Sequence, residues 1–486
     1  MSQAFAIPSQ PLSDARREAT EPDAEGRVGA DEADDKFKVL IAGGGVAALE
    51  AILALTVVGG DSIEIELVTP NPTFSLAALS VAQPFGGDEP RQIDLSEFCA
   101  ARNVELRLDS LSEVWGEQRR ILTGSCEDIP YDALLLAFGA RRVGSIPGAR
   151  PFRAGIDVQW LSRLLGKIES GSTKRVIFAL PESVRWSLPL YELALSTSQW
   201  SRERGADGVS LRIVTADLDP LRIFGWQPAR RINELLDDAG IELITGTVAE
   251  RFEGGVLRCE DGHAYPADAV ITLPDVFVPD VPGLPQGRGG FIGCDAEMRV
   301  DGLESVWIAG DASWFPVKQG GIAAQQAETA AAGIATAAGL DVEPQPFRPT
   351  IRSALLTGAE PEFLRSDMTE EGGGQITTSP LWWPPIKVAG PRLAPFLARE
   401  WGESGDEGAG WMADIDEVNR STEAEHRAAL QISLDYAELD AREGDLRQAL
   451  RWLDVAERLN VTLPPALVER RQEWRRAIEA NEEQAS

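Results

Sequence analysis

Lysine, histidine and cysteine are all scarce in this chain of 486 residues. With only six lysines and two histidines, the sequence offers no Ser-His-Asp triad and no cluster of metal ligands. It also lacks an apolar run of the roughly 20 residues needed to span a bilayer, and its first residues do not resemble a secretory signal. The four cysteines form no C-x-x-C pair, which favours a reducing compartment, so we predict a cytoplasmic protein. They are Cys99, Cys126, Cys259 and Cys294.

Basic residues are few relative to acidic ones. The chain carries 46 lysines and arginines against 77 aspartates and glutamates, for a net charge of −31. Such a balance repels nucleic acid and disfavours tight association with anionic lipid. Residues 1–36 are acidic and poor in aromatic residues, and we predict a disordered acidic tail there.

The most informative motif lies near the N-terminus. An apolar strand ending at Ala42 runs into a G-x-G-x-x-A turn and then into a helix over 47–57. In a dinucleotide-binding turn the first glycine permits the tight bend, the second lets a pyrophosphate approach the backbone, and the helix N-terminus binds its charge. The next strand, 62–68, ends without the usual acidic residue, so ribose recognition is weaker or comes from Thr69 or backbone groups. The predicted binding residues are Gly43, Gly44, Gly45, Val46, Ala47, Ala48 and Thr69.

Two later segments identify the dinucleotide. Residues 132–140 (DALLLAFGA) and 305–312 (SVWIAGDA) each read as a buried strand, and the second is followed by Lys318-Gln319-Gly320-Gly321 and an alanine-rich helix. In this order the three motifs resemble two-dinucleotide-binding-domain flavoproteins, in the branch of type II NADH dehydrogenases and sulfide:quinone oxidoreductases. The resemblance implies a non-covalent FAD whose ribityl chain bonds to Asp311. It adds Gly139, Gly310, Gly320 and Gly321 to the cofactor site.

The resemblance also gives Lys318 a role. It implies that the N-terminus of the helix over 322–337 points at the isoalloxazine, where its dipole would stabilise the anionic reduced flavin. Lys318 would add a full positive charge, and it is our predicted catalytic residue; the alternative is a solvated loop lysine.

The predicted fold class is α/β, with two Rossmann-like domains, a C-terminal cap and an added α-helical hairpin. The boundaries are 37–150 plus 288–340 for the FAD-binding domain, 151–287 for a degenerate NAD(P)-binding-like domain, and 341–411 for the cap. Residues 420–486 resemble a single tetratricopeptide-type unit, which packs on the core or binds a protein partner.

The second α/β unit lacks what each relative uses. NADH-dependent relatives carry a glycine-rich turn, but here the turn 179–187 contains no glycine, so a conventional NAD(P)H site is not expected. Sulfide:quinone oxidoreductases use a cysteine pair near the flavin, but no cysteine lies between Cys126 and Cys259. The two-cysteine sulfide mechanism is therefore not supported.

Three functions remain. The first is an FAD-dependent oxidoreductase that passes electrons from an unidentified small donor to a quinone or similar acceptor. The second is an NAD(P)H-dependent flavin reductase with an unconventional nicotinamide site, and the third is a non-catalytic flavin-bearing interaction protein. In the relatives the quinone enters from the cap, where 379–385 and 392–397 offer aromatic and apolar residues. Those residues could also give weak peripheral contact with the inner membrane face, or simply pack the cap.

Overall fold

The computed structural model of this chain describes residues 36–184, 186–367, 374–382, 386–388, 390–400 and 465–485, with isolated positions between 434 and 453. The predicted acidic tail, apart from Lys36, and nearly all of residues 420–464 of the predicted helical segment lie outside the described residues. The later part of that segment contains a helix, α12 (Pro465–Ala485).

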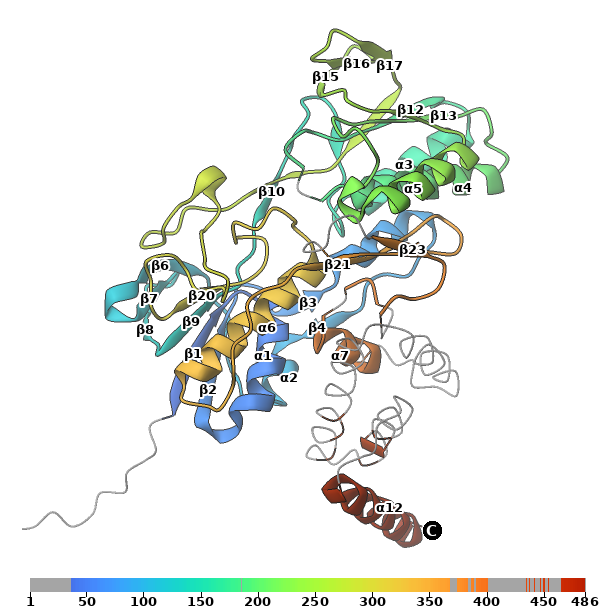
Figure 1. Cartoon of the computed structure of the whole chain (residues 1–486). Helices are drawn as coiled ribbons and strands as arrows, with labels where there is room; N and C mark the ends of the chain where they lie inside the picture. The colour runs from blue at the N-terminus through green and yellow to red at the C-terminus, as the bar shows by residue number, and fades with distance from the viewer. Residues whose placement is uncertain are drawn as a thin grey trace, which may run out of the picture. The chain divides into compact units, whose positions relative to one another are not determined.

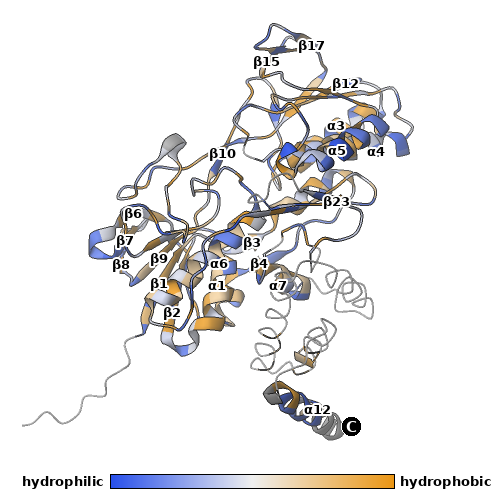
Figure 2. Cartoon of the chain, in the orientation of Figure 1, coloured by the Kyte–Doolittle hydropathy of each residue, from blue (hydrophilic) through white to orange (hydrophobic). Residues whose placement is uncertain are grey.

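The first sheet is fully parallel, with the order β20-β9-β1-β2-β5. Its central strands are almost continuously apolar, as a sheet covered on both faces requires. The helices α1 and α6 pack against each other beside it (Figure 1). Figure 2 shows the apolar residues concentrated in these strands and in α1. The elements are β1 (Phe37–Ala42), α1 (Val46–Gly59), β2 (Ile63–Val68), β5 (Glu105–Arg107), β9 (Ala133–Leu136), β20 (Val306–Ile308) and α6 (Gly320–Ala337).

The second sheet is also parallel, with the order β11-β18-β12-β13-β14. The helices α3, α4 and α5 lie on one side of it, and the small antiparallel sheet β15-β16-β17 packs on the other (Figure 1). The elements are β11 (Arg150–Pro151), α3 (Val158–Glu169), β12 (Arg175–Ala179), α4 (Leu188–Glu203), β13 (Ser210–Val214), α5 (Trp226–Asp238), β14 (Ile241–Ile244), β15 (Ala249–Glu253), β16 (Val256–Cys259), β17 (Ala264–Pro266) and β18 (Ala269–Thr272).

Shorter elements connect and cover the two units. An antiparallel ribbon of β10 (Arg141–Val143) and β19 (Asp275–Phe277) joins them. Two further antiparallel sheets and a short helix extend the first unit: β3 (Thr73–Ser75) with β4 (Gln92–Asp94), β6 (Leu111–Trp115) with β7 (Arg120–Thr123) and β8 (Asp128–Pro130), and α2 (Leu95–Ala100). The segment predicted as the cap, 341–411, contains β21 (Thr350–Leu355), β22 (Glu362–Asp367), β23 (Gln375–Thr377) and α7 (Leu393–Glu400), and we keep the name cap for this segment.

A buried carboxylate fastens the cap to the first unit. Glu50, in the middle of α1, is fully buried and accepts the backbone N–H groups of Arg392 and Leu393 at the start of α7, at 2.6 and 3.0 Å. The Arg392 guanidinium in turn lies 2.8 Å from Glu328 of α6. Burial and the nearby Glu328 raise the pKa of Glu50 well above its ordinary value. The cap helix therefore begins on a fixed point of the first unit.

Within the part of the chain that the structure describes, no helix is long and apolar enough to cross a membrane. The α/β fold class, with two Rossmann-like units built on parallel sheets, is confirmed.

Candidate functional site

In the turn between β1 and α1, the second glycine of the G-x-G-x-x-A motif, Gly45, faces open space. Gly43 has φ 123°, and a Cβ there would lie 2.2 Å from the carbonyl oxygen of Ala137, so packing alone requires glycine. A Cβ on Gly44 would lie 2.7 Å from Thr69 Oγ1. Gly45 is different, because its φ of −95° suits any residue and an added Cβ would meet nothing within 4 Å. The packing of the protein therefore does not require glycine at this position, and the absence of a side chain leaves space for a ligand.

The N-terminus of α1 is free to bind that ligand. Gly45 provides no side-chain cap, and the first turn of α1 contains no acidic residue. The N–H groups there and the positive end of the helix dipole therefore face the open side of the turn, which is the arrangement that binds phosphate.

A cavity of about 680 Å³ opens from this turn. Its volume lies within the range typical of small-molecule sites, about 300–1,000 Å³. Of the predicted site residues, those that line it are Gly44, Gly45, Val46, Ala47, Gly139, Gly310, Asp311, Lys318 and Gly320. Four others are not part of its lining: Gly43, Ala48, Thr69 and Gly321. Thr69 is fully buried, and its Oγ1 accepts the N–H of Asn71, so it shapes the turn that brings Asn71 to the cavity wall.

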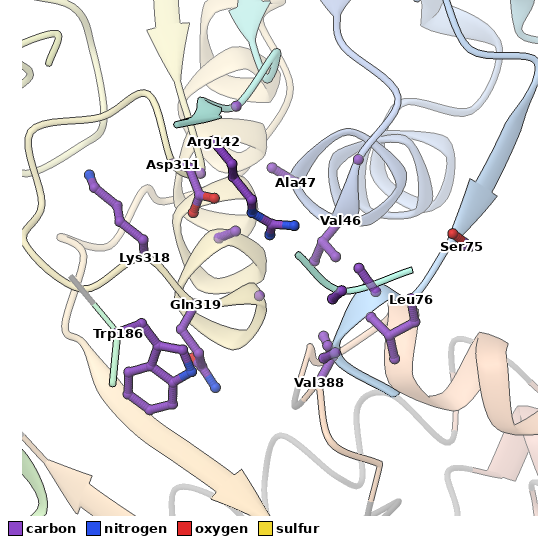
Figure 3. Close-up of a pocket in the computed structure, with 18 of the residues that line it drawn as sticks. Val46, Ala47, Ser75, Leu76, Arg142, Trp186, Asp311, Lys318, Gln319 and Val388 are labelled. Atoms are coloured by element: carbon purple, nitrogen blue, oxygen red, sulfur yellow. The ribbon is translucent and has the colours of Figure 1, made fainter. Parts of the chain in front are cut away.

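Asp311 faces the cavity from the turn after β20 (Figure 3). The preceding residue, Gly310, has φ 89°, and its N–H donates to Gln326 Oε1 at 2.8 Å, which fixes the turn. Burial raises the pKa of Asp311, while the positive charges of Arg142 and Lys318 oppose that rise. Its carboxylate accepts no hydrogen bond from any residue that the structure describes. It is therefore an acceptor available to the hydroxyl groups of a ligand.

Arg142 is a site residue that sequence reasoning missed. It lies on the ribbon strand β10, and its side chain points into the cavity between Asp311 and Val46 (Figure 3). It makes no ion pair with any described residue. A free guanidinium beside the N-terminus of α1 favours an anionic ligand. No local sequence pattern indicates this role. Arg141 and Arg142 are both arginines, and only their positions on strand β10 distinguish them.

The ammonium group of Lys318 is held by the backbone. Its Nζ donates to the carbonyl oxygens of Ser313 and Phe315, both at 2.6 Å, and lies 4.1 Å from the centroid of the Phe291 ring. The side chain is buried, so the solvated-loop alternative does not describe it. Figure 3 shows the ammonium turned away from the middle of the cavity, so Lys318 would act on a ligand through its charge rather than by direct contact.

Gln319 organises the start of α6. Its Oε1 caps the helix by accepting the N–H of Ile322 at 3.1 Å, and its Nε2 donates to the carbonyl oxygen of Arg352 at 2.6 Å. Because Arg352 belongs to the cap strand β21, this one side chain joins the helix N-terminus to the cap. The following Gly320 lines the cavity.

The second unit faces the cavity through a long turn. Three residues, Gly43–Gly45, separate β1 from α1, but eight, 180–187, separate β12 from α4. Leu180 continues the strand pairing through its N–H to Val214 and is buried in the core, while Glu182 is exposed. Val184 and Trp186 of this turn line the cavity instead.

A buried ion pair closes the cap side of the cavity. Lys387, which lines the cavity, places its Nζ 2.7 Å from Glu192 Oε2 on α4. The other carboxylate oxygen of Glu192 accepts the N–H of Leu356 at 3.0 Å. Burial raises the pKa of Glu192, and Lys387 opposes that rise.

The aromatic residues of the cap that the structure describes serve its own packing, and residues 383–385 of the predicted segment 379–385 lie outside the described residues. Trp382 donates from Nε1 to the carbonyl oxygen of Ile386 and packs edge-on against Phe363, with 5.3 Å between ring centroids. Phe396 of α7 is buried against Phe98 and beneath the guanidinium of Arg102. None of these rings lines the cavity, so the packing interpretation describes Trp382 and the segment 392–397.

The cysteines do not contribute to the cavity lining either. None of the four lines it, and all are free thiols. Burial raises the pKa of Cys294 to about 12, so this thiol is protonated at neutral pH and poorly nucleophilic.

The fold is that of the two-dinucleotide-binding-domain FAD/NAD(P)-dependent oxidoreductases, as the three motifs predict. One similar solved structure is the sulfide:quinone oxidoreductase from the hyperthermophilic bacterium Aquifex aeolicus, with TM-score 0.65 and 16% identity over 70% of this chain and 87% of that one. A second is the ferredoxin reductase for the CYP199A2 system of Rhodopseudomonas palustris, with TM-score 0.51 and 22% identity over 68% of this chain and 81% of that one. A third, the putidaredoxin reductase in its covalent complex with putidaredoxin, has TM-score 0.51 and 18% identity over the same shares. No family model and no curated protein matches the sequence.

Proposed function

We propose that this chain is an FAD-dependent oxidoreductase that transfers electrons from a small donor to a quinone or a similar acceptor. The observation that carries the proposal is that one cavity joins the open side of Gly45 to the unpaired carboxylate of Asp311. A flavin dinucleotide needs both features: open space at the helix N-terminus for its pyrophosphate, and an acceptor for the hydroxyl groups of its ribityl chain.

Bound FAD would supply the redox chemistry, and the protein would supply binding, orientation and electrostatics. The N–H groups of α1 and the Arg142 guanidinium would hold the pyrophosphate, and Asp311 would accept ribityl hydroxyl groups. The N-terminus of α6, capped by Gln319, and the charge of Lys318 would favour negative charge on the ring system.

Reduction of a quinone to a hydroquinone takes up two electrons and two protons. Two-electron-reduced FAD would supply both electrons together with one proton, and the second proton would come from the protein. Lys387 lines the cavity, and its Nζ lies 2.7 Å from Glu192 Oε2 in a pair that lies away from solvent. The Lys387 ammonium group would deliver that second proton.

The NAD(P)H-dependent flavin reductase is the second candidate, favoured by Asp217. An acidic residue shortly after the second strand of a Rossmann unit can bind an adenosine ribose, and Asp217 follows β13 in this way. The long turn 180–187 argues against it, because it has no glycine.

Purification followed by absorbance spectroscopy tests the proposal. The wild-type protein should copurify with non-covalent FAD, released by heat or acid. Asp311→Ala, which removes the ribityl acceptor, should purify largely without flavin, whereas Asp311→Asn keeps an acceptor oxygen and should retain part of it. Full flavin occupancy in Asp311→Ala would show that Asp311 is not the ribityl partner, and a wild-type protein without flavin would reject the function itself.

A further inference from the structure

The side of the cavity formed by the second unit is apolar. Among the residues that the structure describes between 151 and 287, which leave out Arg185, every side chain that lines the cavity is hydrocarbon or aromatic. The principal ones are Phe152, Val184, Trp186, Pro189, Leu273 and Pro274. A dinucleotide requires the opposite, since its phosphates and riboses must be matched by N–H groups and polar side chains.

The backbone of this wall is equally unsuited to phosphate. Pro189 stands in the first turn of α4 and has no N–H to donate there. The described residues of this wall therefore lack the polar groups with which a protein binds a nicotinamide dinucleotide.

Trp186 is the one side chain of this wall that carries a polar group. Its ring packs edge-on against Phe224, with centroids 5.9 Å apart and planes at 64°, and Phe224 is fully buried. The indole is therefore held in place on the cavity wall (Figure 3). Its Nε1–H makes no hydrogen bond to any described residue. The side chain is half-buried and lines the cavity, so a ligand with a carbonyl or hydroxyl oxygen there would be able to accept this N–H.

We propose that this apolar wall, centred on Trp186, binds the quinone, as a flat uncharged ring whose oxygen accepts the Trp186 Nε1–H. The proposal rests on the function proposed above, and it places the quinone against the cavity wall that the second unit forms. The cap side offers no comparable surface among the described residues, because the rings of Trp382 and Phe396 are used in packing. From the cap, Lys387 and Ser353 add polar groups to the cavity, which suits the second oxygen of a quinone.

Equilibrium binding to the oxidised holoprotein tests this without turnover. The probe is 2-methyl-1,4-naphthoquinone, titrated by calorimetry and by perturbation of the flavin absorbance. Trp186→Ala should weaken binding at least about tenfold, which corresponds to about 1.4 kcal/mol, because it removes both the stacking surface and the donor. Trp186→Phe keeps a ring but no N–H and should weaken binding by a smaller factor, about three- to fivefold, as expected for one neutral hydrogen bond.

Trp226→Ala is the matched control, because Trp226 is 51% exposed and does not line this cavity. Its quinone affinity should equal that of the wild type, and all three variants should retain FAD. If quinone binds to the wild type and Trp186→Ala binds it equally well, the proposed wall is wrong while a quinone-reducing flavoprotein remains possible. If the flavin-loaded wild type binds no quinone, both the wall and the proposed acceptor are rejected. If no flavin is bound at all, the proposed function fails first.

Discussion

Lys387 and Glu192 form a buried ion pair, 2.7 Å from Nζ to Oε2, between the cap and the first helix after the turn of the second unit. Glu192 is completely buried, and Lys387 is 8% exposed. Removing one partner of such a pair leaves an uncompensated charge and typically destabilises by about 3–5 kcal/mol. The pair therefore helps to position the cap beside the cavity.

Lys387→Met should lower the melting temperature, and the loss should depend on pH. Burial already raises the pKa of Glu192, and without Lys387 it rises further. The folded variant would then hold a proton that the unfolded chain releases, so its stability falls as pH rises above the ordinary glutamate pKa. Thermal unfolding at pH 5 and pH 8 measures this: the loss should be larger at pH 8. Adding Glu192→Gln should recover much of the stability at pH 8, and a loss independent of pH would contradict the expectation.

Gly43 and Gly45 should respond oppositely to alanine. Gly43→Ala places a Cβ on the Ala137 carbonyl at a left-handed φ, so it should destabilise the fold by more than about 2 kcal/mol. Gly45→Ala fits its backbone and its surroundings, so the stability of the apoprotein should change by no more than about 1 kcal/mol. Its FAD affinity should nevertheless fall, because the Cβ enters the space left for the pyrophosphate. Denaturation of the apoproteins and FAD titration separate these effects. Normal FAD affinity in Gly45→Ala would mean that the phosphate does not approach this residue.

Much of the first unit could be predicted from the sequence, because its signals are local. The strand predicted over 62–68 is β2, Ile63–Val68, and the helix predicted over 47–57 is α1, Val46–Gly59. The glycine turn and the strand leading to Asp311 also carry their own patterns. The secondary structure of each of these segments can be predicted without knowing which residues pack against it.

The remaining site residues come from segments that only tertiary structure brings together. Arg142 lies on a connecting ribbon, Trp186 in the turn of the second unit, and Lys387 on the cap, yet all three line one cavity. Leu180 is a further example: it belongs to the turn 179–187, which the sequence singles out only for its lack of glycine, but its N–H continues the strand pairing and its side chain is buried in the core. For these residues, no local sequence pattern indicates the direction in which the side chain points.

NADH and NADPH should reduce the flavin slowly or not at all. The eight-residue turn has no glycine to let a pyrophosphate approach the backbone, and the side chains that the structure describes on the cavity wall beside it are apolar. Anaerobic stopped-flow mixing, monitored at the flavin band, measures the rate. Fast, saturable bleaching at micromolar nucleotide would instead support the flavin reductase, and Asp217→Ala would then be expected to weaken nucleotide binding.

Lys318→Met should lower the reduction potential of the bound flavin. At an effective dielectric of about 20, a unit charge 4 Å away is worth roughly 4 kcal/mol, and the interaction weakens with distance. For a two-electron couple, about 1.4 kcal/mol corresponds to 30 mV, so loss of the charge should lower the potential by tens of millivolts. The Lys318 ammonium is anchored on the carbonyls of Ser313 and Phe315, so the variant should also be less stable than the wild type. Lys318→Arg, which retains the charge, is the control and should keep the potential near the wild-type value. Dye equilibration with FAD still bound measures the potential. If the potential of Lys318→Met is unchanged while its stability is reduced, the role of Lys318 is limited to holding the loop 313–318. The dipole of α6 would then be the group that stabilises the reduced flavin.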